Sequence, residues 1–126
     1  LNMKILVVDD EEDVKSLFEQ KFRREIRAGH FQFSFAFSGE EALDFMARHP
    51  SEVVMILSDI NMPGMSGIEL LKRIRTDHPS APPQVMMITA YGDSANHDQA
   101  MELGANDFLT KPVDFNELKE KLLNIL

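Results

Sequence analysis

Asp59 stands where a buried strand is predicted to end and a loop to begin. The apolar run 53–57 precedes it, and a loop containing Gly64 and Gly67 follows it. Short apolar runs are typical of buried parallel strands, and ligands bind outside the carboxyl ends of such strands. A carboxylate at this place is suited to be a metal ligand, a nucleophile, or both. The simpler alternative is that Asp59 only caps the next helix, a role for which Ser66 is better placed.

Polar side chains also follow three other apolar runs. They are Asp9 and Asp10 after residues 4–8, Thr89 after residues 85–88, and Lys111 after residues 108–110. Because parallel strands end at one edge of their sheet, these side chains are expected to surround Asp59. Crowded carboxylates repel one another unless they share a cation, and oxygen ligands of this kind suit Mg²⁺, with Mn²⁺ as the alternative ion. With the metal in place, Asp59 is expected to attack a phosphoryl group that Lys111 and Thr89 help to bind.

Five strands and five helices are predicted to alternate along the chain. The strands are 4–8, 31–37, 53–57, 85–88 and 108–110, and the helices are 14–26, 39–49, 66–77, 93–103 and 115–125. Phe31, Phe33, Phe35 and Phe37 alternate with smaller residues, which indicates the core face of a strand. Strict alternation predicts an α/β fold of the flavodoxin-like (βα)5 kind. Its doubly wound, five-stranded parallel sheet should have the strand order 2-1-3-4-5.

The composition is that of one soluble domain. The chain has 126 residues, of which 44% are hydrophobic and 27% are charged, enough for a single core. Residues 3–126 are therefore interpreted as one domain, and residues 1–2, ahead of Met3, as a cloning remnant. Without cysteine there is no disulfide framework, and no apolar run is long enough to span a membrane, so a cytoplasmic protein without a membrane partner is expected. A net charge of -8 argues against nucleic acid as a partner.

Four histidines are scattered along the chain without the spacing of metal ligands. They are His30, His49, His78 and His97. Each is interpreted as a solvated side chain, and none is expected to donate a phosphoryl group.

Four motifs, in their order along the chain, resemble those of two-component response-regulator receiver domains. The resemblance covers nearly the whole length of the chain. Val7–Glu11 resembles the acidic motif of that family, Ser58–Gly67 its phosphoacceptor loop, Ile88–Ala90 its switch hydroxyl and Gly104–Pro112 its terminal signature. The resemblance implies a signalling switch that accepts a phosphoryl group from a histidine kinase or phosphotransfer protein. It also implies that the face of the fourth helix, fifth strand and fifth helix then changes for an output domain or target protein, and that the phosphoryl group is slowly lost by autodephosphorylation.

The same resemblance assigns roles to individual residues. Asp59 is the phosphoacceptor, assisted by Lys111 and Thr89. Mg²⁺ is bound by Asp10, Asp59 and the main-chain carbonyl of Asn61, with Asp9 acting through water. Thr89 and Phe108 form the switch pair, although Phe108 lacks the hydroxyl that a tyrosine would have there. Asn61 and Tyr91 flank the path of the hydrolytic water, and the Lys111–Pro112 peptide bond is expected to be cis.

Three other kinds of protein remain alternatives. A magnesium-dependent phosphatase with an aspartyl nucleophile, of the haloacid-dehalogenase type, needs a second acid two positions on, where this chain has Asn61. A flavodoxin-type flavin carrier needs a phosphate-binding loop after the first strand, where this chain is acidic. A pseudo-receiver used only for interaction usually lacks part of the acid, hydroxyl and lysine set.

The chain by itself is expected to phosphorylate and dephosphorylate itself only, not to turn over a substrate as an enzyme.

The charge pattern predicts a monomer or at most a weak dimer. The helix at 93–103 carries Asp93, Asp98 and Glu102 but no lysine or arginine. Lys119 and Lys121 could meet these acids across a two-fold axis, but exposed ion pairs contribute only about 0–1 kcal/mol each. That is too little to offset the cost of association.

Overall fold

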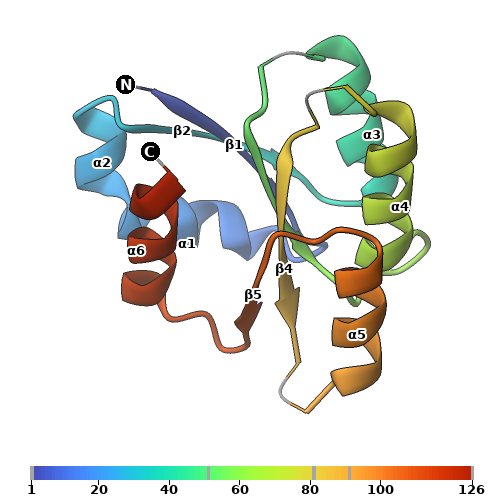
Figure 1. Ribbon diagram of the computed structural model, residues 1–126. Helices are drawn as coiled ribbons and strands as arrows, with labels where there is room; N and C mark the ends of the chain where they lie inside the picture. Colours follow the sequence, from blue (N-terminus) through green and yellow to red (C-terminus); the bar gives the residue numbers. More distant parts are fainter. Residues whose placement is uncertain (1, 51, 81, 91, 126) are drawn as a thin grey trace.

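A parallel sheet forms the centre of the domain in the computed structural model, which describes residues 2–50, 52–80, 82–90 and 92–125 (Figure 1). Its strands are β1 (Met3–Val8), β2 (Phe31–Ala36), β3 (Met55–Asp59), β4 (Gln84–Thr89) and β5 (Asp107–Thr110). They pair in the order β2-β1-β3-β4-β5, and every pairing is parallel. The predicted fold class and strand order are confirmed.

Helices cover both faces of this sheet (Figure 1). One face carries α1 (Asp13–Lys21), α2 (Arg23–Arg27) and α6 (Phe115–Ile125), and the other carries α3 (Gly39–Arg48), α4 (Gly67–Asp77) and α5 (Ser94–Glu102). Side chains of β1 alternate between the two buried clusters, with Leu6 in one and Ile5 and Val7 in the other. Among the described residues, no helix is both long enough and apolar enough to cross a membrane.

Three phenylalanines of the predicted stripe pack in or against the core, as predicted, but Phe37 lies beyond the end of β2 and belongs to neither buried cluster. Phe31, Phe33 and Phe35 pack with rings from the facing helices. Phe22 of the α1–α2 segment is 5.8 Å from Phe31 and 5.0 Å from Phe33, measured between ring centroids. The ring centroid of Phe115, on α6, lies 6.0 Å from that of Phe22. The stripe is therefore a packing surface that joins α1, α2 and α6 to the edge strand.

The predicted single helix over residues 14–26 is wrong, because the backbone bends at Phe22 and gives two helices. Phe22 has φ -107° and ψ 19°, outside the helical range. Its N–H still donates to Phe18, and its carbonyl accepts from Ile26. The buried Phe22 ring stays in the core, so the apolar spacing continues through the bend. Periodicity alone therefore did not reveal the bend. The fourth and fifth helices of the sequence analysis are consequently α5 and α6.

Arg75 ties the end of α4 to two segments distant in sequence. Its guanidinium donates to the carbonyl of Pro83 at 2.7 Å, to the carbonyl of Gly104 at 2.8 Å and to Oδ1 of Asn106 at 2.8 Å. The Val85 N–H donates to the same Asn106 oxygen at 2.8 Å. Hydrogen bonds from a charged donor are stronger than neutral ones, so this network fixes the loop between α5 and β5.

Candidate functional site

Asp59 is the last residue of β3, and its side chain is almost completely buried. The strand begins at Met55 and runs two residues beyond the predicted apolar run, because Ser58 and Asp59 stay in register with Met87 and Ile88 of β4. The backbone of Asp59 is therefore held by the sheet. A side chain on a paired strand is placed more exactly than one on a loop.

Three carboxylates meet at this edge of the sheet. One oxygen from each of Asp9, Asp10 and Asp59 lies within 4.8 Å of the other two. Burial raises the pKa of Asp9, and the charges of Asp59 and Asp10 raise it further. The hydrogen bond from the Glu11 N–H and the charge of Lys111 oppose this rise only in part. Burial and the neighbouring carboxylates thus both oppose ionisation of Asp9.

The donor chemistry of this cluster fits Mg²⁺. All three side chains offer hard carboxylate oxygens, and Asp10 is exposed, so the cluster is open to water on one side. Mg²⁺ prefers oxygen ligands and keeps several waters. Asp9, Asp10 and Asp59 are therefore the residues that would hold the metal. Asn61 lies in the loop that follows β3, next to the cluster.

Lys111 lies against the buried carboxylate. Its Nζ is 2.6 Å from Oδ2 of Asp59, and the Asn61 N–H donates to Oδ1 at 3.2 Å. Burial lowers the pKa of Lys111. The hydrogen bond to Asp59 and the charges of Asp59, Asp9 and Glu11 together outweigh burial, so the net shift is upward. Lys111 therefore stays cationic at neutral pH. Its own backbone N–H donates to the Thr89 carbonyl at 2.8 Å, and its peptide bond to Pro112 is cis.

Thr89 ends β4, and within the described part of the chain its buried hydroxyl makes one hydrogen bond, which is long. The hydroxyl lies 3.5 Å from the carbonyl of Leu109. Phe108, in β5, is half-buried and lies opposite Met87 of β4. The hydroxyl is thus free to reorient toward a group bound at Asp59, because the bond it would give up is weak. Tyr91 lies outside the described residues.

The next helix does not need Asp59 as its cap. The Ser66 side chain accepts a hydrogen bond from the Glu69 N–H at 3.2 Å, which is the arrangement of an N-cap. The interpretation of Asp59 as only a cap is therefore wrong. Gly67 packs directly on the end of β3, where an added Cβ would lie 2.2 Å from the Asp59 carbonyl oxygen.

Sequence reasoning missed two side chains, one against Phe108 and one at the opposite edge of the sheet, before β4 and β5. His97 was expected to be solvated, but its ring lies against that of Phe108, with 4.0 Å between centroids. Arg75 carried no motif that drew attention, although it fixes the loop before β5. Both contacts join elements that local patterns do not connect. His49 also differs from expectation, because its Nδ1 lies 2.7 Å from Glu52.

Comparisons with known proteins agree with this fold. The family model described as "Response regulator receiver domain" matches residues 5–123. The chain is 39% identical over 125 residues to the response regulator protein PilR of Pseudomonas aeruginosa, and the match covers 98% of this chain but only 26% of PilR. It is 33% identical to a chemotaxis protein CheY homolog of Campylobacter jejuni, over 98% of this chain and 92% of that one.

One solved structure is informative about partners. The receiver domain of Ssk1 from Saccharomyces cerevisiae, in a co-crystal with the histidine phosphotransfer protein Ypd1, superposes with a TM-score of 0.83. The two sequences are 25% identical, and the match covers 96% of this chain and 86% of that one.

Proposed function

Because this chain belongs to the response regulator receiver domain family of two-component systems, we propose that Asp59 accepts a phosphoryl group from a histidine kinase or a phosphotransfer protein. One observation carries the proposal. Asp59 is buried at a strand end, with Asp9 and Asp10 beside it and the Lys111 ammonium 2.6 Å from its Oδ2. The complex of Ssk1 with Ypd1 supports a phosphotransfer protein as one kind of donor.

The transfer exchanges one bond to phosphorus for another. A carboxylate oxygen of Asp59 attacks the phosphorus of a phosphohistidine, and the new P–O bond forms as the P–N bond breaks. The electron pair of that bond returns to the imidazole nitrogen. When bound, Mg²⁺ offsets negative charge on the transferred oxygens. Lys111 moves from Asp59 to a phosphoryl oxygen and keeps its charge, which its raised pKa favours.

The signal leaves the site through Thr89. The Thr89 hydroxyl gives up its 3.5 Å bond to Leu109 and donates to a phosphoryl oxygen. Phe108 then turns toward the space near Thr89, and the face formed by α5, β5 and α6 changes for an output domain or a target protein. The long resting hydrogen bond of Thr89 supports this step, because little free energy is lost when it breaks.

We expect the protein to work in the cytoplasm.

The alternative functions fit the site less well. A phosphatase of the haloacid-dehalogenase type would need a proton donor at Asn61, whose amide cannot supply one at neutral pH. A flavin carrier would place a phosphate against Asp9 and Asp10, which would repel it. A pseudo-receiver would not need Asp59, Thr89 and Lys111 together.

Metal and phosphoryl analogue should stabilise the folded domain together. We expect saturating Mg²⁺ with beryllium fluoride to raise the melting temperature by roughly 5–10 °C, since a ligand at a hundred times its Kd stabilises by about 2.7 kcal/mol. The added cation relieves repulsion among Asp9, Asp10 and Asp59. Scanning calorimetry with each component alone, with both, and with both plus EDTA would measure this. Equal melting temperatures in all four samples would contradict the proposed site.

Tyr91 is proposed to slow the loss of the phosphoryl group by shielding it from water. Hydrolysis requires water in line with the acyl phosphate, and a bulky side chain two residues after Thr89 would obstruct that approach. Tyr91→Ala should therefore shorten the phosphoryl lifetime by roughly two- to tenfold, equivalent to about 0.4–1.4 kcal/mol in the barrier. The decay of labelled protein after removal of the donor measures it, with Tyr91→Phe as the control of similar size. A lifetime that is unchanged or longer in Tyr91→Ala would refute the shielding role.

The domain is expected to stay monomeric, and two intrachain ion pairs support this proposal. Lys119 Nζ lies 3.0 Å from Glu25, and Lys121 Nζ lies 2.9 Å from Asp107. Both lysines are thus already engaged within their own chain, and breaking these pairs would offset any gain across a two-fold axis. Sedimentation velocity at tens of micromolar should give a monomer with and without beryllium fluoride and Mg²⁺. A stable dimer that forms only on activation would show that this face associates after all.

A further inference from the structure

His97, on α5, lies with its imidazole ring against the phenyl ring of Phe108, in β5. The ring centroids are 4.0 Å apart and the ring planes meet at 34°, which is direct ring contact. The His97 side chain is 45% exposed, and Phe108 is half-buried at the edge of the core that α3, α4 and α5 cover. The contact joins two of the three elements of the α5-β5-α6 face (Figure 1).

Phe108 packs directly on the His97 ring. Asp98 is a charged neighbour, with its Oδ1 3.6 Å from the His97 Nδ1. The Asp98 side chain is 81% exposed, so water screens this pair and it contributes little. The position of the His97 ring is therefore tied to the position of Phe108.

The ring contact matters for the position of α5, because this helix is held beyond its carboxyl end but lightly packed along its length. Beyond its carboxyl end, Arg75 holds Gly104 and Asn106 by hydrogen bonds. Along the described part of the helix, Ala100 alone is buried. A helix that buries little apolar surface opens or shifts at low free-energy cost. Thus α5 is fixed at one end and lightly packed along its length, and the ring contact of His97 restrains it sideways.

The sheet register places Phe108 and Thr89 on one face. Phe108 is opposite Met87 in the parallel pairing of β5 with β4. Residues two apart on a strand share a face, so Met87 and Thr89 point to the same side of the sheet. Movement of Phe108 toward Thr89 therefore takes its ring along that face and changes its contact with His97.

We propose that His97 is a positioning residue, which holds Phe108 in its resting place and couples the movement of Phe108 to the displacement of α5. The proposal rests on the phosphorylation switch described above. Because the ring contact exists in the resting arrangement and is given up when Phe108 moves, it favours the unphosphorylated state. Removing it shifts the population toward the active state, and a ligand specific for that state then binds more tightly.

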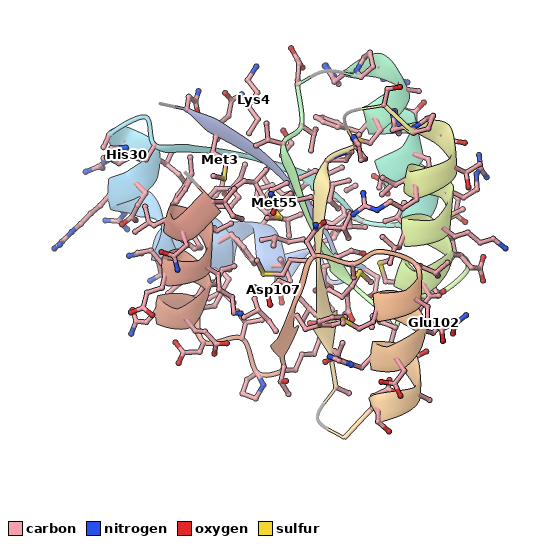
Figure 2. All side chains as sticks on the ribbon, in the orientation of Figure 1. Met3, Lys4, His30, Met55, Glu102 and Asp107 are labelled. Carbon is pink, nitrogen blue, oxygen red and sulfur yellow. The ribbon has the colours of Figure 1, made fainter. Side chains whose placement is uncertain are left out.

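The test is the affinity of the protein for beryllium fluoride in saturating Mg²⁺, measured by titration calorimetry. His97→Ala should bind roughly two- to tenfold more tightly than the wild type, the factor that one aromatic contact supplies. His97→Phe keeps a ring on Phe108 and should bind as the wild type does. Glu102→Ala is the matched control, because Glu102 lies on the same helix and is exposed (Figure 2). Its affinity should not change.

A merely structural role gives a different result. It would lower the melting temperature of His97→Ala while leaving the affinity unchanged or weaker, and that outcome overturns the proposal. If His97→Ala does not fold, His97→Gln removes the ring while keeping a polar side chain, and the same affinity comparison applies. A wild type that binds no beryllium fluoride would instead overturn the proposed function, and this inference with it.

Discussion

Asp59→Asn should abolish phosphorylation by acetyl phosphate, lowering the labelling rate by at least about a thousandfold. The substitution keeps the shape of the side chain but removes the negative charge that attacks phosphorus. It also removes the charge that binds Lys111 at 2.6 Å. Intact mass measured over time, after addition of acetyl phosphate and Mg²⁺, checks this directly.

The control for this experiment is an exposed acid away from the site. Asp44 lies on α3 and pairs with Arg48 at 3.1 Å on the surface. Asp44→Asn should be labelled at the wild-type rate. If Asp59→Asn is also labelled at that rate, the acceptor lies elsewhere, and peptide mapping of the labelled protein would locate it.

Gly67→Ala should destabilise the domain by about 3 kcal/mol or more, a large part of the roughly 5–15 kcal/mol that holds a domain folded. An added Cβ would lie 2.2 Å from the Asp59 carbonyl oxygen and 2.8 Å from the Ile60 Cα. These are backbone atoms of β3 and of the loop that follows it, so they cannot rotate away. The Gly67 N–H also donates to the Ile60 carbonyl at 2.8 Å, which holds the two segments together.

Urea unfolding of Gly67→Ala beside Gly29→Ala separates this clash from the general effect of replacing glycine. Gly29 has φ +77° and nothing within 4 Å of an added Cβ, so Gly29→Ala costs only the left-handed backbone penalty of about 1–2 kcal/mol. The Gly67 variant should be clearly the less stable of the two. Equal stabilities would mean that the loop after β3 moves aside at little cost.

Local patterns in the sequence determined the fold class and which charged side chains meet at one edge of the sheet. Short apolar runs alternating with helical spacing predict a doubly wound sheet, because each buried strand and each one-sided helix leaves its own period in the chain. In that topology Asp9, Asp59 and Lys111 must share an edge, since each lies at or just beyond the carboxyl end of a strand. The structure brings the carboxylates within 4.8 Å of one another and places Lys111 beside them. Their roles in phosphoryl transfer stay proposals.

The sequence was a weaker guide to element boundaries. The strand ending in Asp59 was predicted from its apolar residues alone, but pairing with β4 extends it through Ser58 and Asp59. The helix expected over residues 14–26 bends at Phe22, although its apolar spacing runs on unbroken. Periodicity records which side chains face the core, whereas boundaries depend on backbone pairing and on dihedral angles.

Only the tertiary structure decided which residues of different elements come into contact. The engagement of Lys121 with Asp107, the contact of His97 with Phe108 and the close approach of Gly67 to Asp59 join residues on different elements. None of these leaves a period or a motif in the chain, because each depends on how two elements are positioned after the sheet has formed. The sequence does not distinguish a lysine that pairs within its own chain from one that stays free. Their difference is a distance of a few ångströms that is set by the packing of α6 against β5.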